Sequence, residues 1–242
     1  MALILNIETA TPVCSVALAE NGRIIVLRES SEEKSHAGNL AVFIEEILKE
    51  QHMSVRELSA IAVGKGPGSY TGLRIGVATA KGLSYGAKIP LIAVSTLETL
   101  VQFALQTIEK EKSDVPRDEN TLFCPMIDAR RMEVYMALFD NSGSRKQNDA
   151  AVIVDSDTFS TILASHSLVF FGSGAAKCRD LLNRKNAFLI DGMYPSSSAM
   201  TLKSFQLFQE NRYEDIAYFE PYYLKDFITT TVRKNLLHMP TK

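Results

Sequence analysis

The sequence GKGPGSYTGLRIG, from Gly64 to Gly76, is the most informative segment of the chain. It follows an apolar strand pattern at residues 60–63 and leads into a helix predicted over residues 73–85. Small residues at such a junction can expose backbone N–H groups to an anion, or they can permit a tight turn with positive φ. The segment lacks the Gly-Lys-Ser/Thr ending of a Walker A loop, and Thr71 interrupts a GxGxxG pattern. Both explanations therefore stay open.

The helix after this turn carries small residues on two sides. Two series with a spacing of four recur in it: Gly72, Gly76 and Ala80, and Ala78, Gly82 and Gly86. Each glycine inside a helix costs about 0.5–1 kcal/mol relative to alanine, so the pattern indicates close approach of other elements. Burial of both sides within one domain explains the pattern as well as a partner on one side does.

Before and after this helix, the first half of the chain alternates strands and helices. Strands are predicted at residues 3–9, 13–19, 23–28, 60–63 and 91–94, and a helix with an apolar stripe at residues 36–51. Another helix begins near Ser95 or Thr96, where Ser95 and Glu98 have the spacing of a capping box. Residues 109–120 are charged and contain Pro116, which makes them the best linker candidate.

The second half repeats the pattern of the first. Strands are predicted at residues 122–127, 133–139, 151–154 and 168–171, with helices at residues 158–164, after Gly174, and at residues 199–211. Such a duplication predicts two similar α/β lobes, at residues 1–108 and 121–224, followed by a polar tail at residues 225–242. The order of elements is that of the actin, sugar-kinase and Hsp70 ATPase superfamily.

Composition narrows the classes of function. The 242 residues carry a formal net charge of −2, without the basic stripe of a protein that grips nucleic acid alone. Cys14, Cys124 and Cys178 are widely spaced in apolar stretches and are predicted to be buried free thiols. The N-terminal residues read as a strand rather than a signal peptide, and no apolar run reaches the ~18 residues of a membrane span. A cytoplasmic protein without membrane contact is expected.

Four blocks of the sequence resemble the TsaB/YeaZ family. They are ILNIETATPVCSVALAENG (4–22), GPGSYTGLRIGVATAKGLSYGAKIPLIAVSTLETL (66–100), MIDARRMEVYMALF (126–139) and EPYYL (220–224). The resemblance implies an actin-like two-lobed fold and a non-catalytic role in threonylcarbamoylation of the tRNA adenosine next to the anticodon. It further implies pairing with the catalytic paralogue TsaD and contact, direct or through the complex, with the ATPase TsaE.

In this family two helices form the pairing face, and by position they correspond to residues 36–51 and 73–85. The candidate interface residues are Leu40, Phe43, Ile44, Ile47, Leu73, Gly76, Val77, Ala80 and Leu83. We expect the strip of Gly76 and Ala80 to meet the partner, and Ala78 and Gly82 to face the sheet. The isolated chain is expected to form a homodimer, and tRNA to be reached only through the complex.

The chain departs from the family at the end of its first strand. The family usually reads Ile-Asp-Thr-Ser there, whereas this chain has Glu8 and Ala10 at the second and fourth positions. Both changes argue against nucleotide chemistry, because the aspartate organises metal and phosphate in active superfamily members. Candidate positions for a residual nucleotide cleft are Glu8, Gly66, Gly68, Ser69, Asp128, Arg130, Gly172 and Gly174. For Asp128, Arg130 and Arg131 a salt-bridged turn that holds the lobes together is the alternative.

Two enzymatic alternatives remain, a metallo-glycoprotease-like hydrolase and a nucleotide-binding actin-like ATPase. The first needs a metal site, usually two histidines on one helical face. The four histidines are His36, His52, His166 and His238, and no two of them are four residues apart. No cofactor and no metal are therefore expected, and a non-catalytic subunit is the favoured interpretation.

Overall fold

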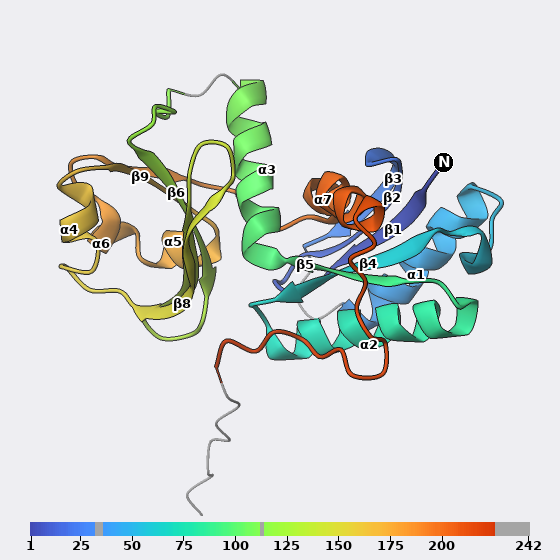
Figure 1. The fold of residues 1–242 in the computed structure, drawn as a ribbon. Coiled ribbons are helices and arrows are strands. Elements are labelled where there is room, and N and C mark those ends of the chain that lie inside the picture. The colour runs from blue at the N-terminus through green and yellow to red at the C-terminus, as the bar shows by residue number, and fades with distance from the viewer. Residues whose placement is uncertain (32–35, 112–113, 226–242) are drawn as a thin grey trace, which may run out of the picture.

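A computed structural model describes residues 1–31, 36–111 and 114–225 of the chain. The described residues form two bodies, each built on a five-stranded sheet, with helix α3 (Thr96–Glu111) between them (Figure 1). The first lobe contains the N-terminal sheet and the second lobe the C-terminal one. No helix in these ranges is long and apolar enough to cross a membrane.

The sheet of the first lobe has the strand order β3-β2-β1-β4-β5. Its strands are β1 (Leu3–Glu8), β2 (Cys14–Glu20), β3 (Arg23–Ser30), β4 (Ala60–Gly66) and β5 (Leu91–Ser95). β1, β2 and β3 form an antiparallel meander, whereas β4 and β5 continue the sheet in parallel. Helices α1 (His36–Glu50) and α2 (Tyr70–Ala87) contribute to the core on one face, and a short 3-10 helix (Val55–Glu57) precedes β4.

The sheet of the second lobe repeats this topology. Its strands are β6 (Thr121–Asp128), β7 (Glu133–Phe139), β8 (Arg145–Ile153), β9 (Ser167–Phe171) and β10 (Ala187–Ile190), in the order β10-β9-β6-β7-β8. Counted from β6 as the equivalent of β1, this is the order of the first sheet. The helices on its outer side are short: α4 (Ser160–Leu163), α5 (Ser173–Lys177) and α6 (Arg179–Leu182). The predicted duplicated α/β fold of two actin-like lobes is confirmed.

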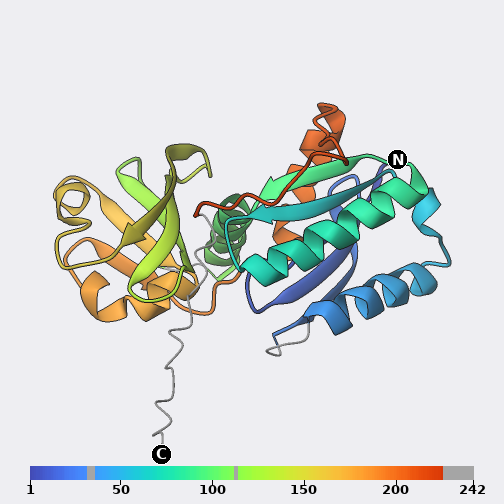
Figure 2. The same ribbon diagram turned by 90° about the horizontal axis from the view of Figure 1, so that it is seen from below.

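The two halves exchange their last helices, which corrects the predicted domain boundaries. Leu97, Leu100 and Val101 of α3 pack into a core with Phe123 and Phe171 of the second sheet. In return, α7 (Ser197–Gln209) packs on the first sheet, where Met200 and Leu207 join Ile4, Ile92 and Val94. The divisions 1–108 and 121–224 therefore do not match the packing, because α3 and α7 each bury their apolar surface on the sheet of the other half. Figure 2 shows α7 and the α1–α2 pair on opposite sides of the first sheet.

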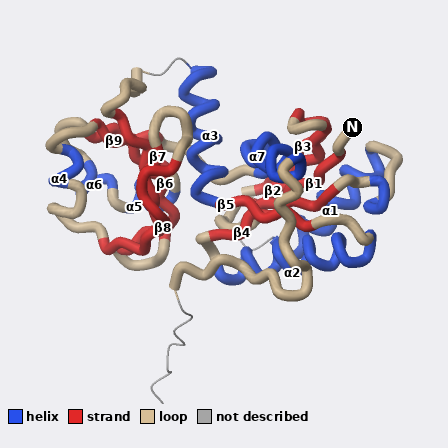
Figure 3. The backbone as a smooth tube through the Cα atoms, in the orientation of Figure 1, coloured by secondary structure: helices blue, strands red, loops and turns tan. Residues whose placement is uncertain are grey.

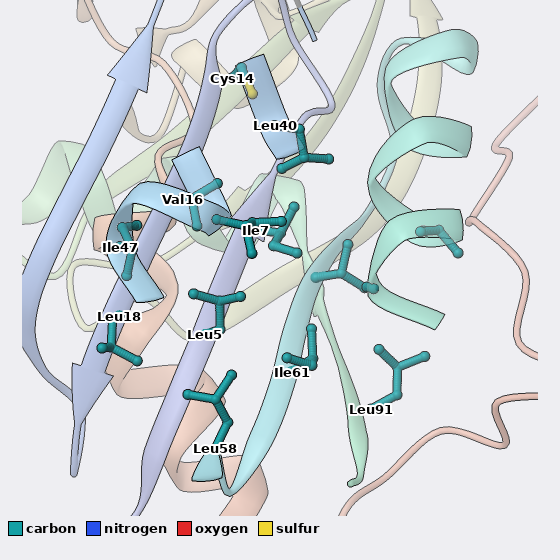
Figure 4. Close-up of a cluster of buried hydrophobic side chains, with 14 of the residues drawn as sticks. Leu5, Ile7, Cys14, Val16, Leu18, Leu40, Ile47, Leu58, Ile61 and Leu91 are labelled. Atoms are coloured by element: carbon teal, nitrogen blue, oxygen red, sulfur yellow. The ribbon is translucent and has the colours of Figure 1, made fainter. Parts of the chain in front are cut away.

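The core of the first lobe explains why its strands are apolar on both faces. Leu5, Ile7 and Ile61 point towards Leu40 and Ile47 of α1, as Figure 4 shows. Ile4, Ala60 and Ala62 face α7 on the other side. Cys14, Cys124 and Cys178 are buried free thiols, as predicted. Burial raises the pKa of the Cys14 thiol to about 11 and raises that of Cys124 further, so neither is a thiolate at neutral pH.

Most predicted elements are confirmed, although the short 3-10 helix at Val55–Glu57 was not predicted and three further differences occur (Figure 3). Strand β8 begins at Arg145 rather than at residue 151, β10 was not predicted, and α3 extends through Glu111 into the predicted linker. Ser95 caps α3 as expected, because its Oγ lies 3.5 Å from the backbone nitrogen of Glu98. The predicted tail lies outside the described residues, apart from Lys225.

Candidate functional site

The end of β1 holds a buried carboxyl group. Glu8 is fully buried, and its Oε1 accepts hydrogen bonds from the backbone N–H groups of Thr9 at 2.9 Å and Ala10 at 2.8 Å. Its Oε2 lies against Gly64 and has no hydrogen-bond partner among the described residues. Burial raises the pKa of Glu8 to about 7, although the amides of Ala10 and Thr9 and the hydroxyl of Thr96 act to lower it. The Glu8 side chain thus accepts the hydrogen bonds from the N–H groups of the β1–β2 turn that an external anion would need.

The glycines of the glycine-rich turn pack directly on the β1–β2 turn. A Cβ atom built at Gly68 would lie less than 3.0 Å from the backbone oxygen of Ala10. One built at Gly72 would lie less than 3.0 Å from the backbone oxygen of Thr9, and one built at Gly76 would meet the Thr9 hydroxyl. Close approach between β1 and α2 therefore accounts for these glycines without a bound phosphate.

Hydrogen bonds join the same two turns. Ser69 N donates to Ala10 O at 2.7 Å, and the Thr9 hydroxyl donates to Gly72 O at 2.9 Å. Ser69 is also the N-cap of α2, since its Oγ accepts from Gly72 N at 3.3 Å. Several donors that could face an anion at this helix N-terminus are thus already satisfied within the chain.

A C-terminal segment covers the turn from the outside. We call residues 214–224 the strap; they run from α7 across the first lobe towards the second (Figure 2). Tyr222 N donates to Lys65 O at 2.7 Å, and a Cβ at Gly66 would lie 2.9 Å from Tyr222 O. The ring of Tyr223 lies 5.1 Å from that of Tyr70 at the start of α2. Lys81 Nζ donates to Phe219 O at 2.8 Å, which fixes the strap along α2.

The second lobe has an equivalent junction after β9. Gly172 has φ 96°, and Cβ atoms at Gly172 and Gly174 would overlap Met126 or Val134. These glycines also serve close packing. Asp128 is exposed at the end of β6, accepts a hydrogen bond from Arg130 N at 2.7 Å and pairs with Lys177.

Asp128 forms its ion pair with Lys177 of the same lobe, so this pair does not hold the two lobes together as the salt-bridged alternative expected. Lys225, directly after the strap, contacts the second lobe through its ion pair with Glu133. The cleft candidates form two groups: Glu8, Gly66, Gly68 and Ser69 at one junction, and Asp128, Arg130, Gly172 and Gly174 at the other. No hydrogen bond or ion pair within the described ranges joins the two groups.

The orientation predicted for α2 is reversed. Most candidate interface residues are buried in the core of their own lobe: Leu40, Ile44, Ile47, Leu73, Gly76, Val77 and Ala80. Phe43 and Leu83 are half-buried against that core. Gly76 and Ala80 face inward because the stripe that they share with Leu73 and Val77 covers the sheet. They are not available to a partner.

The opposite side of α2 is exposed and flat. Ala78, Gly82 and Gly86 lie at the surface, and a Cβ atom built at either glycine would have nothing within 4 Å. Tyr85 of the same helix is 78% exposed, and Val42 of α1 is 48% exposed. The four-residue spacing had shown this strip, but it did not reveal which of the two strips faced the sheet. We call Ala78, Gly82, Tyr85 and Gly86 of α2 the exposed helix face.

The described residues offer no metal site to the hydrolase or the ATPase alternative. Within the described residues no three His, Cys, Asp or Glu side chains gather where they could hold a metal ion. His52 and His166 lie at separate places, after α1 and before β9.

Comparison with known proteins identifies the family of this chain. The chain matches the family model described as "TsaD: tRNA N6-adenosine threonylcarbamoyltransferase" over residues 29–226. The tRNA threonylcarbamoyladenosine biosynthesis protein TsaB of Escherichia coli (strain K12) is 31% identical over 229 residues, which cover 92% of this chain and 94% of the relative. TsaB of Bacillus subtilis (strain 168) is 36% identical over 136 residues, 56% of this chain and 54% of that relative.

The solved structures agree on the fold. YeaZ from Pseudomonas aeruginosa superposes with a TM-score of 0.74 at 23% identity, and the match covers 93% of this chain and 100% of that one. Fold and site thus define a two-lobed actin-like α/β protein whose glycine-rich turn is filled by its own chain. The chain belongs to the TsaB/YeaZ family and contains a domain of the TsaD type.

Proposed function

We propose that the chain takes part in tRNA threonylcarbamoyladenosine biosynthesis as a non-catalytic partner of a TsaD-like catalytic paralogue. The observation that carries this proposal is its similarity to E. coli TsaB over nearly the whole of both chains. The reaction takes place in the cytoplasm, where the buried thiols stay reduced. A TsaE-like ATPase docks on the assembled pair.

The closed junction supports a role without catalysis. In an active member of an actin-like superfamily the turn after β1 holds phosphate, whereas here Glu8 Oε1 takes the N–H groups of Thr9 and Ala10. The strap lies over Lys65 and Gly66 on the outside of the same junction. A nucleotide phosphate at this place would have to displace a buried carboxyl group and the packed backbone of Thr9 and Ala10.

The exposed helix face is the proposed site of pairing. Its small residues Ala78, Gly82 and Gly86 let a partner helix approach closely, and Tyr85 offers the large amphipathic contact that interfaces favour. The same face lets isolated chains pair with each other. Because the net charge is −2, we propose that tRNA is held mainly by other subunits.

The variant Ala78→Arg tests the pairing face. A long charged side chain on this strip would hold a partner helix away, and loss of a close-packed contact of this kind costs about 2 kcal/mol or more. We expect binding to the TsaD-like paralogue to weaken at least about tenfold, with an unchanged melting temperature because Ala78 is exposed. Titration of the paralogue by calorimetry, together with thermal melting, measures both.

The matched control is Ala164→Arg, which makes the same change at an exposed position at the end of α4 in the second lobe. It should bind the paralogue like the wild type. If Ala78→Arg also binds normally, the pairing face is elsewhere on the molecule. Equal weakening by both variants would point to a general effect of added charge rather than to α2.

The role in the pathway is tested in the native cell. Depletion of the chain should lower threonylcarbamoyladenosine in digested total tRNA, measured by mass spectrometry, and re-expression of the wild type should restore it. Re-expression of Ala78→Arg should restore it less well than Ala164→Arg. An unchanged level of the nucleoside after depletion would contradict the proposed function, whatever the result of the binding experiment.

A further inference from the structure

A pocket of about 320 Å³ lies where the two lobes face each other. The first lobe contributes Lys65 at the end of β4, Ser95 at the end of β5, and Tyr222 of the strap. α7 and the loop after it contribute Lys203 and Arg212, and β8 of the second lobe contributes Arg145 and Asp149. β5 and β8 are edge strands of their sheets, so the pocket opens between two edges. Lys65 and Tyr222 also border the glycine-rich turn, where Tyr222 N donates to Lys65 O, but none of the lining residues belongs to the exposed helix face.

The charges in this pocket do not balance. Its cations are Lys65, Arg145, Lys203 and Arg212, and its carboxylates are Glu98 and Asp149, which leaves a net charge of +2. Arg145 binds both carboxylates, Glu98 at 3.1 Å and Asp149 at shorter range. The nearest carboxylate of Arg212 is the exposed Glu210, at 3.7 Å.

Lys65 and Lys203 form no ion pair in the part of the chain that the structure describes, although the charge of Lys65 acts on Asp149, and both lysines are half-exposed. Cations in excess of their counter-charges repel one another and are partly desolvated, which lowers stability. Such an arrangement is explained when an anion fills the pocket. The Ser95 hydroxyl also lines it, and burial raises the pKa of Tyr222, so its hydroxyl stays protonated and can donate a hydrogen bond.

We propose that this pocket binds a small phosphate-bearing molecule between the two lobes. A phosphoryl group carries up to two negative charges and several acceptor oxygens, which match two lysines, two arginines and two hydroxyl groups. The volume lies at the lower end of the range of about 300–1,000 Å³ for small-ligand sites. A ligand held by Lys65 and Lys203 on one side and Arg145 on the other would tie the lobes together. The site is independent of the proposed function, since it shares no residue with the pairing face.

Calorimetric titration of the full-length chain with inorganic pyrophosphate, at low ionic strength in a phosphate-free buffer, tests the site. We expect saturable binding with a Kd below about 1 mM. Lys65→Ala and Lys203→Ala should each weaken binding at least about tenfold. The control Lys185→Ala removes an exposed lysine from the turn before β10 and should bind like the wild type. Titrations with adenosine monophosphate and inorganic phosphate show whether an ester or a free phosphate is preferred.

Thermal melting is the second test, because it distinguishes lysines that bind a ligand from lysines that only stabilise the fold. Without ligand, Lys65→Ala and Lys203→Ala should melt at the wild-type temperature or above it, because each removes a repelled cation. With pyrophosphate, the wild type and Lys185→Ala should gain melting temperature and the two pocket variants should not. Equal affinity for sulfate would mean an adventitious ion only. Equal affinity for sulfate would therefore overturn the proposal. So would the absence of saturable binding below about 1 mM, or pocket variants that bind like the wild type.

Discussion

Gly72→Ala is expected to destabilise the first lobe by about 3 kcal/mol or more. Gly72 lies in the first turn of α2, and the added Cβ would overlap the backbone oxygen of Thr9, with less room than at any other glycine described. A backbone oxygen cannot rotate away as a side chain can. Relief would require α2 to move off β1, which would also break the hydrogen bond from the Thr9 hydroxyl to Gly72 O.

The matched control is Gly82→Ala in the same helix. A Cβ at Gly82 meets nothing within 4 Å, so alanine should stabilise the helix by about 0.5–1 kcal/mol. Urea unfolding of both variants measures the two free energies. Opposite signs at two glycines ten residues apart would show that close packing, not helix propensity, explains Gly72. A Gly72→Ala variant as stable as the wild type would refute the packing explanation.

The glycine-rich stretch predicted a strand-to-helix turn correctly, but it could not show what the turn faces. Thr9 and Ala10 are far from this turn in the sequence but lie against it in the fold. Their backbone oxygens fill the space that a phosphate would need. Nothing in the local pattern distinguishes a glycine that admits a ligand from one that admits a neighbouring turn. That distinction depends on tertiary contacts.

The duplication was visible in the sequence, whereas the exchange of α3 and α7 was not. An apolar stripe shows that a helix is buried, but not which sheet buries it. The strand β10 is only four residues long and lies between polar turns, so its pattern was too short to recognise by itself. The duplication itself predicts this strand, because β5 of the first sheet should have a counterpart that follows β9 in the second sheet.

The orientation of α2 could also have been read from the sequence. Gly76 and Ala80 alternate with Leu73 and Val77 at spacings of three and four, which together form a single apolar stripe. Ala78 and Gly82 are accompanied by Arg74 and Tyr85, both exposed. The composition of each stripe, rather than the small residues alone, decides which side faces the sheet.

Glu8 explains why its own junction favours glycine at position 64. The carboxyl group fills the space beside Gly64, and a Cβ there would lie less than 3.0 Å from either carboxyl oxygen. Oε1 is satisfied by two backbone N–H groups, but Oε2 has no partner among the described residues. Ionisation therefore places charge on a buried atom, which the nearby Thr96 hydroxyl offsets only in part. The protonated form avoids this charge, and it is the form that the folded state prefers up to about neutral pH.

We expect Glu8 to make the chain less stable as the pH rises. Its pKa is about 7 in the folded protein against an ordinary value of 4.5, so its contribution is fully favourable below 4.5 and is lost as the pH passes through 7. Relative to Glu8→Gln, which keeps an acceptor for Thr9 and Ala10, the wild type should lose about 3 kcal/mol between pH 4.5 and pH 8. Urea unfolding of both proteins across this range measures the difference in the free energy of unfolding, to which the other titrating groups contribute equally.

Glu45→Gln is the control. The pKa of Glu45 is lowered by its hydrogen bond to Lys49, so the difference in the free energy of unfolding between wild type and Glu45→Gln should not grow in the same direction. A flat difference between wild type and Glu8→Gln would mean that Glu8 remains in one protonation state throughout.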